Sequence, residues 1–401
     1  MRKLIPGLVA LSILGLVGCG GGAGGVNKTS MKIYVQQRLY DKAIAQGTKA
    51  LALNAADGDT HYFLGVAYYG KDNDQKPEAP AYGDSAELFL SKAYEHFEAA
   101  KKLAAGAWGK SADDNIVSMF GRHYNRGVIA TKKNDHATAA LEYRLATIAD
   151  HENYQGYYAH AAAIWELAKL AKKAKNETEF DAMTDAALLD LERVIELKPA
   201  DKDRVVSVWQ TKGEILWQKG QKKESQEALA RAIELDPENY DLPRVIGNRF
   251  YNDGDFEGAI EYLTLSLSVK ERLNQVGADD AETYSIIGTI YNKQGKFDEA
   301  LASFDKALKL TPEGQRAYEE ALYNVLVTHY KAGDSFEKDG KMDEAKAHYN
   351  EGIKVGTQLV GINPNKDVAY QVLGYCQRGI GDTAAAARSL KRFNELRQKA
   401  Q

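Results

Sequence analysis

The chain has 401 residues, of which 44% are hydrophobic and 27% charged, and only 8 are proline. This composition is typical of a folded protein and excludes disorder for most of the chain. The 52 basic and 56 acidic residues give a net charge of −4, and both signs are interspersed along the sequence. A basic stripe of the kind that binds nucleic acid is therefore lacking.

Residues 1–18 have the profile of an export signal. Met1-Arg2-Lys3 is positively charged, and an apolar run follows from Leu4 to Val17. The run is shorter than the roughly 20 residues that a membrane-spanning helix needs. Leu16-Val17-Gly18-Cys19 then resembles the lipobox of bacterial lipoproteins. The resemblance implies that the signal peptide is removed before Cys19 and that the Cys19 thiol receives a lipid, which anchors the protein to a bilayer.

The residues after the cysteine bear on location. Gly20 stands where an aspartate would favour retention in the inner membrane of enteric-type bacteria. The resemblance therefore implies a lipid-anchored protein of the cell envelope, on the outer membrane and facing the periplasm if the host is Gram-negative. Because five of the next six residues are glycine, we expect residues 19–30 to form a flexible lipidated tether.

From residue 31 to residue 205 the sequence predicts divergent helix pairs with inserts. Tyr34–Leu53 has the pattern of an abbreviated first unit, and a second unit with a long insert follows. The insert, Gly70–Ser85, is acidic and turn-rich, so we expect it to be non-helical, as a partner-binding loop or as tolerated variation. A third unit begins near Phe120, and Tyr154–Lys198 is predicted to be a pair of longer helices.

Residues 206–314 contain the clearest repeats. Gly213 and Gly247 are 34 residues apart, each within a similar pattern of apolar residues. The best unit, from Ala281 to Gly314, carries an aromatic, a glycine and a second aromatic on its first helix, then alanines around a phenylalanine, then a proline: Tyr284, Ile287, Gly288, Tyr291, Ala300, Phe304, Ala307 and Pro312. This pattern resembles the tetratricopeptide repeat, in which small residues allow two helices to approach closely.

Residues 315–401 continue the array. Gln315–Pro364 is predicted to be a helix pair with an extended first helix, and a last unit from about Asp367 ends in a polar capping helix. The resemblance implies an all-α fold, a right-handed α-solenoid of about eight or nine tetratricopeptide-type helix pairs. No stretch alternates in the manner of a strand, so the sequence agrees with this expectation.

A search for enzymatic and metal-binding motifs predicts no catalytic residues, no cofactor-binding residues and no metal site. Gly106–Ser111 ends like a phosphate-binding loop, but Ala104 stands where the leading glycine is required. The 8 histidines are scattered, without the spacing of metal ligands. Cys376 is expected to be a small buried residue, with a reactive thiol or an intermolecular disulfide as alternatives.

The resemblance also implies a binding surface, because first helices of tetratricopeptide arrays line a groove that receives peptides. Carried onto the best-matching units, the groove positions are Gln210, Glu214, Trp217, Arg244, Asn248, Tyr251, Ser285, Thr289, Asn292, Gln371, Tyr375 and Arg378. Amides, aromatics and charged groups suit backbone hydrogen bonding and stacking, although the same residues are compatible with a solvated helix face.

The sequence thus favours a non-catalytic, membrane-anchored scaffold that binds proteins or peptides of the cell envelope, in secretion, pilus or envelope assembly. We expect no nucleic-acid partner, no small-molecule substrate and no cofactor. Two alternatives stay open: an envelope hydrolase or carbohydrate-active enzyme with its site in an insert, and a self-assembling structural array.

Overall fold

A computed structural model describes residues 23–400 of the chain. Every regular element in this range is helical, with eighteen α-helices and one short 3-10 helix, so the predicted all-α class is confirmed. Contacts divide the chain into two units, one ending at Ala232 and one beginning at Ile233, within α10. This division falls inside residues 206–314, which were predicted from the sequence to form one continuous run of repeats. Cys19 and the predicted signal peptide lie outside the described residues.

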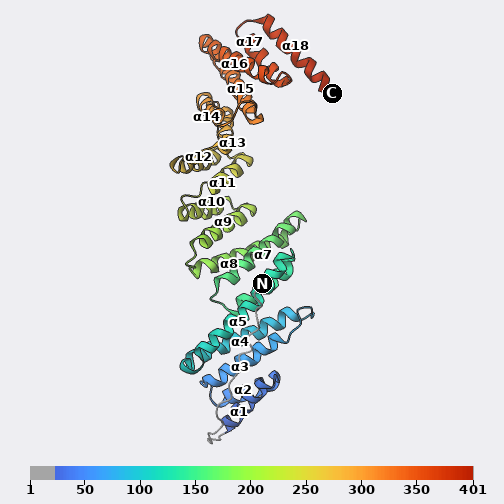
Figure 1. Ribbon diagram of the computed structural model, residues 1–401, viewed down its shortest axis with the longest axis vertical. Helices are drawn as coiled ribbons and strands as arrows, with labels where there is room; N and C mark the ends of the chain where they lie inside the picture. The colour runs from blue at the N-terminus through green and yellow to red at the C-terminus, as the bar shows by residue number, and fades with distance from the viewer. Residues whose placement is uncertain (1–22, 401) are drawn as a thin grey trace. The chain divides into compact units, whose positions relative to one another are not determined.

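The first unit contains antiparallel helices that follow one another in chain order (Figure 1). They are α1 (Ala23–Gln36), α2 (Tyr40–Leu53), α3 (Gly58–Asn73), α4 (Tyr82–Leu103), α5 (Ala105–Lys132), α6 (His136–Ala149), α7 (Tyr154–Lys173), α8 (Glu177–Glu196), α9 (Lys202–Gln218) and most of α10 (Lys222–Leu235).

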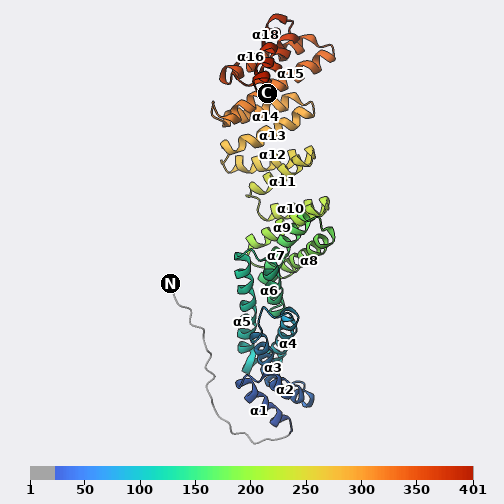
Figure 2. The same ribbon diagram turned by 90° about the vertical axis from the view of Figure 1, so that its right-hand side faces the viewer.

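The second unit has the same organisation, and the turned view shows its helices stacked in sequence (Figure 2). It contains α11 (Asp241–Asn252), α12 (Phe256–Arg272), the 3-10 helix η1 (Ala278–Asp280), α13 (Ala281–Lys293), α14 (Phe297–Leu310), α15 (Arg316–Lys338), α16 (Met342–Ile362), α17 (Asp367–Gly379) and α18 (Thr383–Ala400). The helices of the two units form nine consecutive pairs, in agreement with the eight or nine predicted.

In most pairs a glycine of one helix lies directly against a large side chain of the other, and we call it a close-contact glycine. A Cβ added to Gly288 of α13 would lie 2.8 Å from the Phe304 ring of α14, and one added to Gly65 of α3 would lie 2.7 Å from Phe97 of α4. Both phenylalanines are fully buried. Because the missing Cβ lets the ring sit directly on the helix backbone, each pair is held by a dense local contact and needs few contacts to distant helices.

Turns and caps fix the length of each helix. Gly295 and Gly340 end their helices at φ 76°, a left-handed conformation that glycine adopts without steric cost. Asp135 starts α6 by accepting a hydrogen bond of 3.1 Å from the backbone N–H of Thr138. Such boundaries follow from local sequence, which explains why most predicted helix pairs lie where the repeat pattern places them.

The amino-terminal prediction is wrong from residue 23 onward. Ala23–Ser30 belongs to α1 instead of a flexible tether, and α1 and α2 form a complete helix pair. Met31 is fully buried against α2 and α3, and the Lys28 ammonium lies 2.9 Å and 3.0 Å from carboxylate oxygens of Asp57 and Asp59. These tertiary contacts outweigh the poor helix propensity of the glycines.

The insert Gly70–Ser85 is also shorter than predicted. Helix α3 continues to Asn73 and α4 begins at Tyr82, so only residues 74–81 lie outside helices. Asp72, which was assigned to the irregular insert, is a fully buried residue on the last turn of α3. Its partners are on α5, about fifty residues later in the chain, and local sequence does not reveal them.

Candidate functional site

The predicted groove residues of the first unit lie on α9. Gln210, Glu214 and Trp217 are all partly exposed. The Glu214 carboxylate accepts a hydrogen bond of 3.2 Å from Gln218, and the Lys222 ammonium lies 5.3 Å from the centre of the Trp217 ring. The tryptophan thus presents an apolar surface with a cation on one face, an arrangement that suits stacking with a partner side chain.

On α11, two of the three predicted residues have identifiable contacts. Arg244 is paired with Asp241 at 2.7 Å, and the Lys293 ammonium from α13 lies 5.5 Å from the centre of the Tyr251 ring. The Oδ1 atom of Asn248 is buried and accepts no hydrogen bond. A buried amide oxygen without a donor is uncommon in folded proteins, because leaving it unpaired is costly.

On α13, the Thr289 hydroxyl donates to the backbone carbonyl oxygen of Ser285 at 2.8 Å, so this hydroxyl is held by its own helix. Asn292 donates from Nδ2 to the Thr328 hydroxyl of α15 at 2.8 Å, whereas its Oδ1 atom is buried and has no donor. The neighbouring first helices α11 and α13 therefore each carry one amide oxygen with unused acceptor capacity.

The predicted residues of α17 form a small cluster. Gln371 donates to the Tyr375 hydroxyl at 2.9 Å, and the Arg378 guanidinium lies 5.4 Å from the centre of the Tyr375 ring. Tyr330 of α15 lies beside the same ring, with ring centres 5.5 Å apart. These side chains are preorganised by one another, but no described contact connects them with the predicted residues of α11 or α13.

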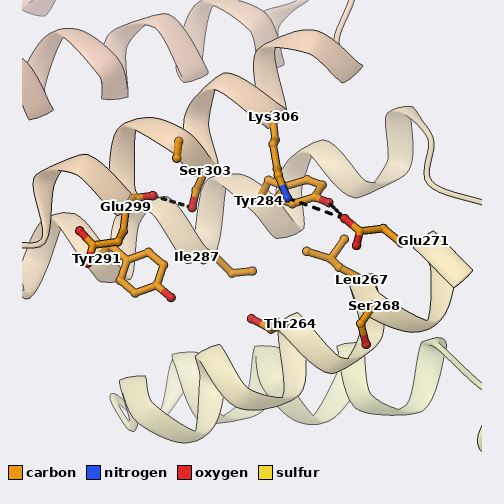
Figure 3. A pocket seen from close by; sticks show the side chains of 11 residues that line it. Thr264, Leu267, Ser268, Glu271, Tyr284, Ile287, Tyr291, Glu299, Ser303 and Lys306 are labelled. Carbon is orange, nitrogen blue, oxygen red and sulfur yellow. Dashed lines mark hydrogen bonds and ion pairs between the residues drawn. The ribbon is translucent and has the colours of Figure 1, made fainter.

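A pocket of about 310 Å³ lies on another face of α13, where sequence analysis predicted no site. Figure 3 shows α13 side chains facing residues of α12 and α14 across it. Its lining is Thr264, Leu267, Ser268, Glu271, Tyr284, Ile287, Tyr291, Glu299, Ala302, Ser303 and Lys306, none of which is a predicted groove residue. Two of these residues, Tyr284 and Tyr291, belong to the repeat motif itself.

The chemistry of this pocket is that of a recognition surface. Leu267 and Ile287 line its apolar part, while Tyr284 donates to Glu271 at 3.1 Å and Lys306 lies 3.7 Å from the same carboxylate (Figure 3). Burial, with a contribution from Glu271, raises the pKa of Tyr284 to about 12, so this phenol is a neutral donor near pH 7. A partner side chain with an apolar body and a polar tip would match this lining.

Other features that could carry chemistry are placed as follows. Gly106–Ser111 lies inside α5, which is not the loop that phosphate binding requires. Cys376 is buried, as predicted, and burial raises the pKa of its thiol to about 12, which keeps the thiol protonated near neutral pH. Within residues 23–400, no three or more His, Cys, Asp or Glu side chains are grouped to hold a metal ion. In the same range no helix is long and apolar enough to span a bilayer.

Comparison with known proteins identifies the repeats. Two models of the tetratricopeptide repeat match residues 206–239 and 281–313. No curated protein matches the chain by sequence.

Solved structures with a similar fold include the C-terminal part of a TPR repeat-containing protein from Cytophaga hutchinsonii. It is 22% identical, covers 68% of this chain and 95% of its own, and has a TM-score of 0.43. MamA from Desulfovibrio magneticus RS-1 is 16% identical, covers 50% of this chain and 97% of its own, and has a TM-score of 0.36.

The two matched segments coincide with helix pairs that the structure contains. Residues 281–313 span α13 and α14 with the Gly288–Phe304 contact, and residues 206–239 include Gly213, whose added Cβ would lie 2.5 Å from Leu229. Arrays of this repeat present helix faces to other proteins. The chain therefore contains tetratricopeptide repeats at residues 206–239 and 281–313, and these repeats support a protein-interaction scaffold.

Proposed function

We propose that this scaffold binds an extended peptide segment of a partner protein along its first helices. The observation that carries the proposal is the pair of unpartnered amide oxygens, Asn248 Oδ1 on α11 and Asn292 Oδ1 on α13. A peptide backbone supplies N–H donors at regular spacing, so a bound segment would satisfy both oxygens. Tyr251 of α11, whose ring contacts Lys293 of α13, supplies a surface on which a partner side chain can stack.

We further propose that the scaffold works at a bacterial membrane, held by a lipid on Cys19. The support comes from the amino-terminal sequence: a positive start, an apolar run and the Leu16-Val17-Gly18-Cys19 tetrapeptide. With α1 beginning at Ala23, only three residues separate Cys19 from the first described helix residue. A tether this short would hold the start of α1 within about 15 Å of the lipidated Cys19.

Peptide binding can be tested by site-specific photocrosslinking in intact cells. A photoreactive phenylalanine analogue replaces Tyr251 or Tyr375, and a matched control replaces exposed Glu257 on the second helix α12. We expect discrete crosslinked partners from the first-helix positions and none of them from the control. Asn248→Ala and Asn292→Ala, combined with the analogue at Tyr251, should reduce the crosslinked yield several-fold while helicity is unchanged.

The same experiment separates the alternatives. Crosslinks joining two copies of this chain would support the self-assembling array instead. Equal crosslinking from Glu257 and Tyr251 would contradict a first-helix groove, and crosslinking confined to an analogue placed at Tyr291 would move the site to the pocket of Figure 3.

The anchor has an independent test. Cells labelled with radioactive palmitate should incorporate label into the wild-type chain and not into Cys19→Ser, with Cys376→Ser as the control that keeps the label. Fractionation should place wild-type protein with membranes and release Cys19→Ser into the soluble fraction. A Cys19→Ser chain that is still labelled would contradict the anchor and leave the peptide-binding proposal intact.

A further inference from the structure

One pair of positions recurs beside the close-contact glycines. The first position lies on the first helix, four residues before the glycine. The second position lies on the second helix, one residue before the residue whose side chain covers the glycine. We call these two the paired positions. In α13 and α14 they are Tyr284 and Ser303, which both line the pocket described above. Histidine recurs at these positions elsewhere in the chain.

Five of the 8 histidines occupy paired positions, although their spacing in the sequence is irregular: His61, His96, His123, His329 and His348. His160 occupies the equivalent position in a helix pair that has no close-contact glycine. His123 precedes Gly127 by four residues, and its Nδ1 lies 2.7 Å from the Glu142 carboxylate, directly before Tyr143. His160 on α7 lies 2.6 Å from Asp190, with Ile164 and Leu191 in place of the glycine and its cover. In these two pairs the histidine has a carboxylate partner.

In the other two pairs, histidine faces histidine. His61 is four residues before Gly65, and His96 is one residue before Phe97. Their Nδ1 atoms are 3.0 Å apart. His329 and His348 stand in the same relation to Gly333 and Tyr349, in the other unit of the chain, with Nδ1 atoms 3.2 Å apart.

An aromatic ring covers the second histidine of each pair at the same register. Three residues after the glycine, Tyr68 stacks on His96 with ring centres 5.7 Å apart. Phe336, also three residues after its glycine, stacks on His348 at 5.4 Å. The same arrangement of four elements, two imidazoles, a glycine contact and a stacked ring, is thus built twice.

We propose that each histidine pair is a binding site for a divalent late first-row metal ion such as Cu²⁺, Ni²⁺ or Zn²⁺, held by the two Nδ1 atoms. Imidazole is a preferred ligand of these ions. Two nitrogens bound at about 2.0–2.1 Å to one ion are separated by roughly 2.9–3.4 Å, depending on geometry. Both observed separations lie in that range, and the four rings are partly exposed, so an ion and its waters can enter.

The surroundings of His61 favour a ligand role. Its Nε2 lies 3.0 Å from the carbonyl oxygen of Ala55, so Nε2 carries the proton and Nδ1 presents a lone pair toward His96. Metal-binding histidines are oriented by such a hydrogen bond from the other ring nitrogen. In the free protein His96 therefore donates from Nδ1, and on metal binding this ring changes tautomer: Nδ1 loses its proton to water and Nε2 takes one up, so the ligand stays neutral.

The pKa is lowered for one ring of each pair, His96 in the first and His329 in the second. Burial, with repulsion from His61 and Lys92 and partial compensation by Glu95, lowers the pKa of His96 to about 4. Burial and His348 lower the pKa of His329 to about 4 in the same way, with Glu351 opposing. These two rings are thus neutral near pH 7. Glu95 and Glu351 are held by Lys92 at 2.8 Å and Lys354 at 2.6 Å, so water completes the coordination.

The test is a metal titration of the full chain in detergent. Calorimetry with Zn²⁺ should give two equivalents bound per wild-type chain, one for His96→Asn, one for His348→Asn and none for the double variant. His136→Asn, outside the pairs, and His123→Asn, in a carboxylate pair, should both retain two. Electron paramagnetic resonance of added Cu²⁺ should show coupling to two imidazole nitrogens in wild type and lose it in the double variant.

Several outcomes would overturn the proposal. They are the absence of saturable binding in wild type, an unchanged stoichiometry in the double variant, and loss of binding in His136→Asn. Helicity is measured for each variant, and His61→Asn and His329→Asn attack the same sites from the opposite helix. If His61→Asn or His329→Asn still binds two equivalents of Zn²⁺, the pairs are hydrogen-bonded histidines and not metal sites.

Discussion

Helix pairs α3/α4 and α5/α6 differ at one paired position, and the difference changes the electrostatics of the whole pair. Both have a close-contact glycine covered by an aromatic ring and a histidine four residues before it. In α5/α6 the residue facing that histidine is Glu142, whereas in α3/α4 it is His96. A single residue before the covering ring therefore decides whether the contact carries charge or is neutral.

The charged pair belongs to a larger buried network. His123 lies between Glu142 and Asp72, Arg122 contacts Asp72 at 2.7 Å, and Tyr82 donates to Glu142 at 2.9 Å. Burial lowers the pKa of His123, but its hydrogen bonds to Asp72 and Glu142 act in the opposite direction and the net pKa is raised. Buried ion pairs of this kind depend on every member, because an unmatched buried charge is costly.

The largest expected effect is therefore the loss of one carboxylate. Glu142→Ala should destabilise α5 and α6 by about 3–5 kcal/mol, because His123 Nδ1 and the buried Tyr82 hydroxyl lose their acceptor. His96→Asn, at the same position of α3/α4, removes a neutral hydrogen bond and should cost only about 1 kcal/mol. Urea unfolding with segment-resolved hydrogen exchange measures both, and equal costs would contradict the distinction between the pairs.

The shared glycine contact supplies the next prediction. Gly127→Ala places a Cβ 2.5 Å from the Tyr143 ring and should cost about 1–3 kcal/mol through overpacking. Gly65→Ala, 2.7 Å from Phe97, should cost a similar amount, since this contact does not involve the paired positions. Gly121→Ala is the matched control in α5: nothing lies within 4 Å, so it should stabilise the helix by up to about 1 kcal/mol.

The repeat pattern made these glycine contacts partly predictable. Gly288 was assigned to a close approach of two helices from the resemblance to the tetratricopeptide pattern, and its contact with Phe304 agrees. The paired histidines were not predictable, because each partner is 19 to 35 residues away and no motif marks it. The burial of Asp72 and the helical state of Ala23–Ser30 were missed for the same reason: their causes are tertiary contacts.

Acidification should affect the two helix pairs with opposite sign. His96 has a folded pKa of about 4, below the unfolded value, so between about pH 6.5 and pH 4 the unfolded state binds more protons and stability falls. At pH 5 this amounts to about 2 kcal/mol relative to pH 8. His329 in α15/α16 should behave alike. The raised pKa of His123 stabilises α5/α6 below the unfolded pKa, and this contribution is lost as pH rises through the folded pKa.

Segment-resolved hydrogen exchange from pH 8 to pH 5, corrected for intrinsic exchange rates, separates these contributions. Protection of α3, α4, α15 and α16 should decrease relative to α5 and α6. His96→Asn should abolish the decrease in α3 and α4 alone, and a uniform change in all helices would contradict the assignment to individual histidines.

The smallest effect tests whether a nearby carboxylate is sufficient to turn a neutral pair into a charged one. Glu95 is adjacent to His96 in sequence, but it is exposed and bonded to Lys92 at 2.8 Å. Glu95→Gln should therefore change stability by at most about 0.5 kcal/mol, as is usual for exposed ion pairs.

Because Glu95 opposes the burial that lowers the pKa of His96, its removal should lower that pKa slightly further. Titration of the histidine ring protons by NMR measures the shift. A large shift, comparable to the one that Glu142→Gln should cause at His123, would mean that proximity alone sets the charge. A small one would mean that a carboxylate must itself be buried against the ring, as Glu142 is, before the pair becomes charged.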